Sequence, residues 1–364
     1  YRTPLTFESQ GTPDYGMTSF LINVLLVAVL LIFTAYLVLS KQELPQIWHY
    51  MRQANPWWLM GGVLLLTVFV CCESVILYHL FRKLRVPAKF RRCIVYSYVG
   101  FFFSAVTPSA SGGQPVQLVW MKRDGLDFGV SSLVLLVVTL AYKLALVVLS
   151  LVLFIFNAGF VLDNLGFMLY VFILGLVLNL AFCVFLAVVI FRPKPARKVA
   201  NLVLNILCKF RLVRNREDMA EKFEQGIDRY SRGADLLLGR KELLWEVFGI
   251  TVFQRLCFFA ITFMVYEAFS LSGTNFFQII ALQVVLSLAL DILPFPGGIG
   301  ANEGGFLVMY TQVFGASLVV PGMLLSRGIN YYLLVILGAV ITVISYILRQ
   351  RRVAKQRKRD EERC

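Results

Sequence analysis

Six long apolar runs limit what this 364-residue chain can fold into more than any other feature of its sequence. Each is predominantly hydrophobic over roughly 20 residues or more, the length that a helix needs to cross about 30 Å of hydrocarbon. Hydrophobic residues make up 59% of the chain and charged residues only 15%, a balance far from that of a soluble domain. The runs are Phe20–Leu39, Trp57–Phe81, Phe128–Phe156, Phe167–Phe191, Trp245–Leu271 and Val320–Leu348. We therefore predict an all-α polytopic membrane protein with six full spans.

Two further apolar stretches, 93–120 and 275–319, are interrupted by motifs rich in Gly and Pro. The first motif reads Thr-Pro-Ser-Ala-Ser-Gly-Gly-Gln-Pro over 107–115, and the second reads Pro-Phe-Pro-Gly-Gly-Ile-Gly-Ala-Asn-Glu-Gly-Gly over 294–305. Irregular backbone at membrane depth is tolerated only where protein buries it or a polar cavity solvates it. The pattern predicts two re-entrant helical hairpins with the motifs at their tips.

Basic residues predict which connections face the cytoplasm. The connector 82–92, the segment 192–244 and the tail 349–364 carry most of the Lys and Arg, whereas 157–166 carries none. Cytoplasmic loops are enriched in Lys and Arg. We therefore predict that these three segments and both termini, including the N-terminal tail 1–19, are cytoplasmic and that 157–166 is an outer loop.

The predicted elements form an internal repeat. Residues 20–156 run span, span, hairpin, span, and residues 167–348 repeat this order with the opposite orientation. Lys143 and Arg327 follow the Gly-Gly pairs of the two motifs at nearly the same distance, and each lies inside the span after its hairpin. Inverted repeats of this kind are typical of transporters that work by alternating access to a midplane site.

The two motifs, at 107–114 and 294–303, resemble those of the lysylphosphatidylglycerol synthase transmembrane family, which includes the flippase module of the multiple peptide resistance factors. The resemblance covers roughly residues 20–348. It implies lipid translocation, because the bifunctional relatives synthesise aminoacyl-phosphatidylglycerol on a cytosolic domain and move it to the outer leaflet, which repels cationic antimicrobial peptides. Only 16 residues follow the last run, so we expect this chain to lack the aminoacyltransferase domain of those relatives.

The motifs and the intramembrane charges supply the candidate site residues. A half-helix that begins at a hairpin tip exposes backbone N–H groups and a positive dipole end, which suit a phosphate, and charges inside spans are costly unless paired or hydrated. The candidates for headgroup binding are Thr107, Ser109, Ser111, Gly112, Gly113, Gln114, Lys143, Arg255, Gly297, Gly298, Asn302, Glu303 and Arg327. Glu73 and Asp291 are candidate counter-charges, or partners of an aminoacyl ammonium. The structural alternative is that the tips allow close helix packing and the charges form internal salt bridges.

We expect a phospholipid flippase or scramblase of the plasma membrane that moves (aminoacyl-)phosphatidylglycerol or a related lipid through a midplane headgroup cavity. The alternatives are the membrane part of a phosphatidylglycerol lysyltransferase and an anchor for a separate synthase. We expect no catalytic residue, metal or other cofactor on this chain, because the sequence has no nucleophile elbow, Walker loop or zinc helix. A homodimer is compatible with the sequence, which does not fix the oligomeric state.

The cytoplasmic segments predict contact with the membrane surface. In 192–244, apolar residues at helical spacing lie opposite basic ones, which indicates a basic amphipathic helix. Two stripes carry this pattern: Val199, Leu202, Val203, Ile206 and Phe210, and then Met219, Phe223, Ile227 and Tyr230. We expect this segment and the basic tail 349–364 to contact anionic lipid headgroups. Nucleic acid is the other partner that such charge could suit, but cytoplasmic flanks of membrane proteins are commonly basic, and we expect no nucleic acid partner.

Overall fold

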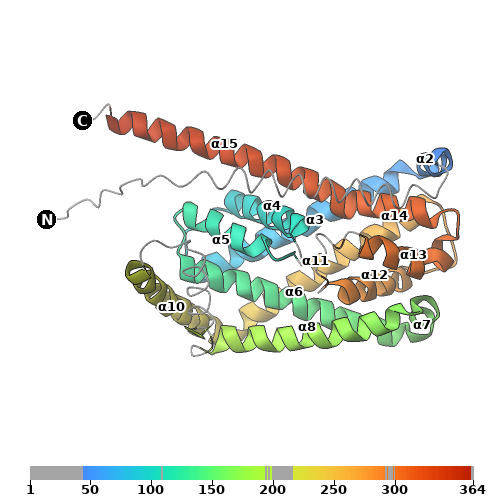
Figure 1. Ribbon diagram of the computed structural model, residues 1–364, viewed down its shortest axis with the longest axis horizontal. Coiled ribbons are helices and arrows are strands. Elements are labelled where there is room, and N and C mark those ends of the chain that lie inside the picture. The colour runs from blue at the N-terminus through green and yellow to red at the C-terminus, as the bar shows by residue number, and fades with distance from the viewer. Residues whose placement is uncertain are drawn as a thin grey trace. The chain divides into compact units, whose positions relative to one another are not determined.

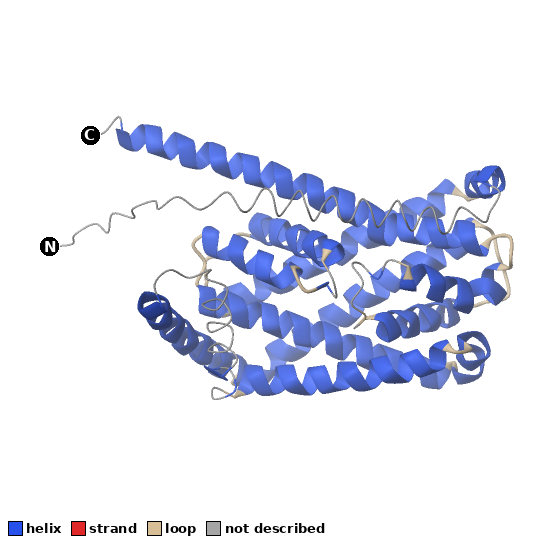
Figure 2. Ribbon diagram, viewed as in Figure 1, coloured by secondary structure: helices blue, strands red, loops and turns tan. Residues whose placement is uncertain are grey.

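The computed structural model describes residues 44–107, 110–192, 195, 197–198, 216–291, 293, 298 and 300–361. Every regular element within these residues is a helix, as Figure 2 shows, so the all-α prediction is confirmed for the part of the chain that is described. The first predicted span, Phe20–Leu39, lies outside the described residues.

Within the described residues, five helical segments are long and apolar enough to cross a membrane, and they coincide with the other five predicted runs. Asn55 starts the first of them by accepting a hydrogen bond from the Trp57 backbone N–H at 3.0 Å, and Asp127 starts the second by accepting one from the Val130 N–H at 3.0 Å. Both are N-cap contacts of the ordinary kind. The segments are α3 (Pro56–Lys83), α6 (Phe128–Phe156), α8 (Met168–Phe191), α11 (Lys241–Ala268) and Val319–Arg351.

The apolar run predicted that the last of these segments would be one continuous α-helix, but the structure interrupts it. It consists of α14 (Val319–Arg327), the π-helical turn η3 (Gly328–Leu333) and α15 (Leu334–Glu361). The π-turn begins directly after Arg327, and π-turns inside α-helices occur frequently at functional sites. Helix α15 continues past the predicted end of the span and includes most of the basic tail.

The first interrupted stretch forms an antiparallel helical hairpin of α4 (Phe90–Val106) and α5 (Gly113–Arg123). Near the tip, a Cβ added at Gly113 would lie 2.7 Å from the Gly100 carbonyl oxygen, so the two backbones are close. Further from the tip, Gln117 Nε2 donates to the Tyr96 carbonyl at 2.9 Å. From Gly113 to Gln117 the partners in α4 move back from Gly100 to Tyr96, so the two helices run antiparallel.

The second interrupted stretch forms another antiparallel hairpin, of α12 (Phe276–Leu290) and α13 (Ala301–Phe314). Its open end is fixed by the Tyr310 hydroxyl, which donates to the Ile279 carbonyl at 2.9 Å. At 1.5 Å per residue, the longest of the four hairpin helices spans only about 25 Å, which is less than the hydrocarbon thickness. That the hairpins re-enter the membrane from one side stays a prediction, and these lengths agree with it.

Helix α6 lies at the centre of the bundle. It packs against α8, α11, α12 and the hairpin helix α5, and Figure 1 shows the two hairpins approaching each other from opposite ends of the bundle over the middle of α6. Apolar side chains of α6 such as Leu133, Val134 and Leu146 are fully buried in these contacts. The arrangement brings both hairpin tips to one region of a single helix.

The outer connection contains a helix where a loop was predicted, and the segment 192–244 contains a helix at the second predicted stripe, as expected. The segment 157–166 contains the short helix α7 (Ala158–Leu165), which ends at Gly166 with φ 51°. In the segment 192–244, helix α10 (Arg216–Leu238) packs against α6, with Ile227 and Tyr230 buried. The second predicted stripe is therefore covered by protein at these two residues, because the end of α6 presents an apolar surface to it. The first stripe, from Val199 to Phe210, lies outside the described residues.

A close approach of α8 and α12 makes Gly175 the most sensitive small residue in this part of the bundle. A Cβ at Gly175 would lie 2.5 Å from the Leu288 carbonyl oxygen and 3.0 Å from the Ala289 Cα, both of which are backbone atoms. We expect Gly175→Ala to destabilise the protein by about 1–3 kcal/mol, because overpacking forces backbone shifts. Gly249→Ala in α11 is the matched control, since no atom lies within 4 Å of the added Cβ. Equal melting temperatures for the two variants in detergent would contradict this contact.

Candidate functional site

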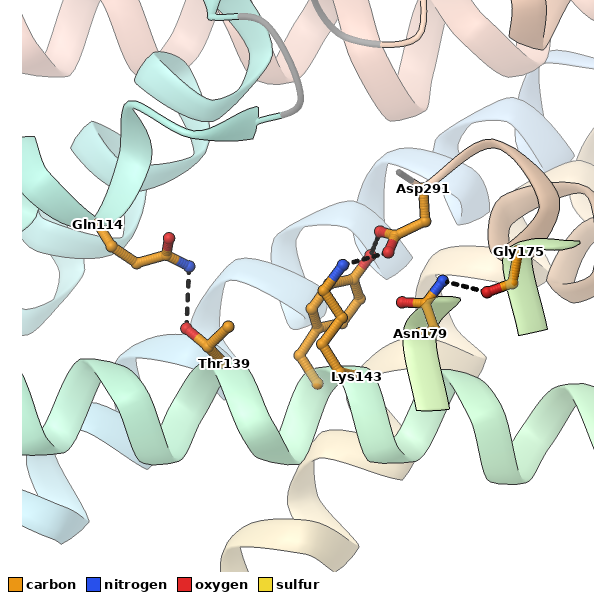
Figure 3. Close-up of polar contacts among 7 residues, drawn as sticks. Gln114, Thr139, Lys143, Gly175, Asn179 and Asp291 are labelled. Atoms are coloured by element: carbon orange, nitrogen blue, oxygen red, sulfur yellow. Dashed lines mark hydrogen bonds and ion pairs between the residues drawn. The ribbon is translucent and has the colours of Figure 1, made fainter. Parts of the chain in front are cut away.

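The two hairpin tips reach α6 one helical turn apart. On the first hairpin, Gln114 Nε2 donates to Thr139 Oγ1 at 3.0 Å. On the second, Asp291 forms an ion pair with Lys143. Residues four apart on a helix are neighbours, separated by about 6 Å along its axis. Figure 3 shows both contacts above the same stretch of α6.

The ion pair of Lys143 and Asp291 joins α6 to the end of α12. Their side chains are only 13% and 10% exposed. Asp291 also accepts a hydrogen bond from the Tyr142 hydroxyl at 2.6 Å, so both of its oxygens have donors from α6. A pair of opposite charges that is mostly buried is costly to separate, and here it holds the second hairpin tip against the middle of a span.

A second ion pair joins the same hairpin to the irregular last span. Arg327 Nε lies 2.8 Å from Glu303 Oε1, with the two side chains 12% and 4% exposed. The other Glu303 oxygen accepts the Gly300 backbone N–H at 2.7 Å and so caps α13. The Arg327 guanidinium also lies 4.4 Å from the centre of the Tyr331 ring, and the Tyr331 hydroxyl donates to the Ala105 carbonyl of the first hairpin at 3.1 Å. The last span therefore contacts both hairpins, as α6 does.

A third charged group lies between α3 and α11. Glu73 Oε2 accepts a hydrogen bond from Gln254 Nε2 at 3.0 Å. The Arg255 guanidinium lies 4.0 Å from the centre of the Tyr142 ring and 5.0 Å from that of Phe69. Among the described residues, Arg255 Nε is buried without a hydrogen-bond partner. Arg255 is thus stacked on the tyrosine that contacts Asp291.

Several predicted tip residues make contacts within their own hairpin. Thr107 Oγ1 donates to the Phe103 carbonyl at 2.6 Å and accepts the Gly112 N–H at 2.8 Å. Asn302 lies against Gly298, which has φ 64°. The contacts of Thr107, Gly112 and Gly113 are therefore those of the structural alternative, in which the tip residues allow close packing. The Thr107 hydroxyl bonds to the backbone, and the two glycines leave room for neighbouring atoms because they have no Cβ. Ser111 is exposed at the tip.

Ser109 and Gly297 lie outside the described residues. Four of the intramembrane charges form two ion pairs at the second hairpin, Lys143 with Asp291 and Arg327 with Glu303. Arg255 stacks on Tyr142, which contacts Asp291, whereas Glu73 lies apart, bonded to Gln254.

Sequence reasoning missed five polar residues of this region. They are Thr139, Tyr142, Asn179, Gln254 and Tyr331. Asn179 is the clearest case, because it is an amide in the otherwise apolar helix α8 and has 0% exposure. An amide inside such a run has to find a hydrogen-bonding partner, and that signal was present in the sequence.

A separate polar cluster ties the open end of the first hairpin to α15. Asp124, at the end of α5, pairs with Arg92 and with Arg349 of α15, whose Nη1 lies at 3.4 Å. The Tyr96 hydroxyl donates to the same carboxylate at 2.7 Å. Three donors from two elements therefore share one acceptor.

Removing this acceptor should loosen α15 from the hairpin. We expect Asp124→Ala to destabilise the protein by about 2 kcal/mol, because three partly buried donors lose their partner. Hydrogen exchange should become faster around Arg349 while the middle of α11 is unchanged. Unchanged exchange around Arg349 would contradict the assigned role of Asp124.

Fold and site define a helical multi-pass membrane protein in which two helical hairpins meet the middle of a span, the first through a hydrogen bond and the second through buried ion pairs. The sequence matches the family described as Lysylphosphatidylglycerol synthase TM region over residues 20–338, and the chain belongs to this family. A comparison with individually curated proteins gave no significant match. Family membership supports a role connected with membrane lipids.

Proposed function

We propose that the protein is a phospholipid flippase or scramblase that moves lipid headgroups past the two hairpin tips. The observation that carries this proposal is the meeting of both tips on one turn of α6, at Thr139 and Lys143. Charged and polar groups halfway along apolar spans mark substrate pathways in membrane proteins, and broken helices at midplane sites are typical of transporters.

The chemistry of the region suits a phospholipid headgroup. Lys143, Arg255 and Arg327 are cations from three different spans, and each lies beside an aromatic ring as well as near a carboxylate. A phosphate could exchange with Asp291 or Glu303 as the partner of these cations, because arginine and lysine bind carboxylates and phosphates through the same donors. Family membership makes phosphatidylglycerol, with or without an aminoacyl group, the first substrate to test.

The proposal also includes alternating access. The site between the tips would open first to one leaflet and then to the other as the ion pairs of Asp291 and Glu303 separate and re-form. The competing hypothesis, an anchor for a separate synthase, predicts that these charges can be neutralised without any change in lipid movement.

Reconstitution into vesicles tests the proposal. Purified protein is incorporated into liposomes that contain fluorescent phosphatidylglycerol in both leaflets, and dithionite is added outside. We expect vesicles with protein to lose fluorescence from both leaflets and protein-free vesicles to lose only that of the outer leaflet. Equal losses in the two preparations, with and without a membrane potential or pH gradient, would contradict the proposal. Co-purification of a lipid synthase with such an inactive protein would favour the anchor.

A further inference from the structure

The helices α8 and α11, which pack against α6 and α12 on either side of the ion pair of Lys143 and Asp291, carry three buried polar atoms without a hydrogen-bond partner among the described residues. They are Asn179 Oδ1, Gln254 Oε1 and Arg255 Nε. Asn179 and Gln254 are both 0% exposed. Buried polar atoms are nearly always satisfied in folded proteins, and one that is not requires an explanation. Two of these atoms belong to the surroundings of the ion pair, because α8 contacts Lys143 through Phe182 and Arg255 stacks on Tyr142. Gln254 bonds instead to Glu73 of α3.

The orientation of the Asn179 amide is fixed by its other end. Nδ2 donates to the Gly175 carbonyl one turn earlier, at 3.0 Å. Exchanging the nitrogen and oxygen would place two acceptors against each other, so the oxygen must face away from Gly175. In Figure 3 this oxygen points toward the side of Lys143. The same face of α8 carries Phe182, whose ring centre lies 5.5 Å from Lys143 Nζ.

Arg255 supplies the complementary donor on the other side of the cluster. Its guanidinium stacks on the Tyr142 ring at 4.0 Å, and Tyr142 donates to Asp291 at 2.6 Å. A ligand in contact with both Arg255 and Asn179 would need an anionic acceptor for the guanidinium and an N–H or O–H for the amide oxygen. A phospholipid headgroup has its phosphate as the acceptor, and a glycerol or an ammonium as the donor.

We propose that Asn179 and Arg255 make the site selective for phospholipids whose headgroup carries an N–H or O–H donor. This inference rests on the proposed function, because it treats the cluster as the place where a headgroup passes. Phosphatidylglycerol and phosphatidylethanolamine satisfy the Asn179 oxygen, whereas phosphatidylcholine does not, because its trimethylammonium group has no hydrogen to donate. Leaving a buried acceptor without a partner penalises the wrong headgroup.

A binding measurement tests the selectivity independently of transport. Purified protein in detergent is titrated with fluorescent phosphatidylglycerol, and the three lipids, with identical acyl chains, compete for it. We expect phosphatidylglycerol and phosphatidylethanolamine to bind about five- to tenfold more tightly than phosphatidylcholine, the factor that one hydrogen bond contributes. Soluble glycerophosphoglycerol should not compete, and equal competition by it would overturn the assignment to lipid.

Asn179→Leu should abolish this preference and bind all three lipids equally. The matched control is Asn164→Leu in α7, because Asn164 makes the same bond to a carbonyl one turn earlier, at 2.8 Å, and has the same unpartnered oxygen. Asn164 lies away from the charged cluster, so its substitution should leave the preference unchanged. Each variant loses the same two groups, an oxygen without a partner and an Nδ2 donor bonded to a carbonyl one turn earlier, so we expect their melting temperatures without lipid to change by equal amounts.

The outcomes separate the two proposals. Equal binding of the three lipids by the wild type, or an unchanged preference in Asn179→Leu, would overturn the selectivity even if lipid moves in vesicles. A preference that depends on Asn179 in a protein that moves no lipid would support the headgroup site and overturn translocation.

Discussion

Arg327→Leu is expected to destabilise the protein by about 3–5 kcal/mol, the loss that follows when one partner of a buried ion pair is removed. The Glu303 side chain is only 4% exposed, so its carboxylate would remain in a poorly solvated position with the Gly300 N–H as a donor. The free energy of unfolding, measured by denaturant titration in mixed micelles, should fall by this amount.

Neutralising both partners should recover most of the lost free energy of unfolding. In Arg327→Leu/Glu303→Gln the uncompensated charge is gone, and the glutamine oxygen can still accept the Gly300 N–H that caps α13. Glu246→Gln serves as the control, because the pair of Glu246 with His79 is on the surface, with Glu246 52% exposed, and such pairs contribute about 0–1 kcal/mol. A single Arg327→Leu variant as stable as the wild type would show that the pair does not hold the hairpin.

Lys143→Met should slow lipid movement by about ten- to hundredfold, corresponding to the loss of one charge-assisted hydrogen bond of about 1.5–3 kcal/mol. Methionine preserves the length and apolar stem of the side chain, so packing against Phe182 is kept while the contact to Asp291 is lost. The initial rate of dithionite-accessible fluorescence loss in vesicles measures the effect.

The neighbouring residue provides the control for this experiment. Leu144 is 39% exposed on α6, and Leu144→Met should leave the rate unchanged. Lys143→Arg keeps the charge but alters its geometry, so an intermediate rate is expected. If Lys143→Met moved lipid at the wild-type rate in a properly folded sample, the ion pair would be structural only.

Apolar length was sufficient to predict five spans, because a run such as Phe128–Phe156 has no other way to satisfy its backbone in a membrane than a helix. The short helix α7 was not predicted, since eight residues between two spans carry no periodic signal. The π-turn that begins at Gly328 was also missed, because the continuous apolar run Val320–Leu348 carries no signal for a change of helix type.

The charged residues of the site were identifiable, but their partners were not. The internal repeat suggested equivalent roles for Lys143 and Arg327, yet both pair with the second hairpin, one through Asp291 and the other through Glu303. Pairing depends on which helices pack side by side, and a single sequence does not contain that information. The polar tip residues were ambiguous for a related reason, since the same Thr107 hydroxyl that could bind a ligand also closes the turn.

The central claim is that lipid headgroups reach the middle of α6, and mapping photo-crosslinks tests it most directly. A phosphatidylglycerol analogue with a diazirine on its headgroup is irradiated with the reconstituted protein, and the modified peptides are identified by mass spectrometry. The account predicts crosslinks on α6 at Thr139 and Lys143 and on α8 near Asn179, between the two hairpin tips. Crosslinks confined to the ends of the spans, near Phe128 and Phe156, would contradict it.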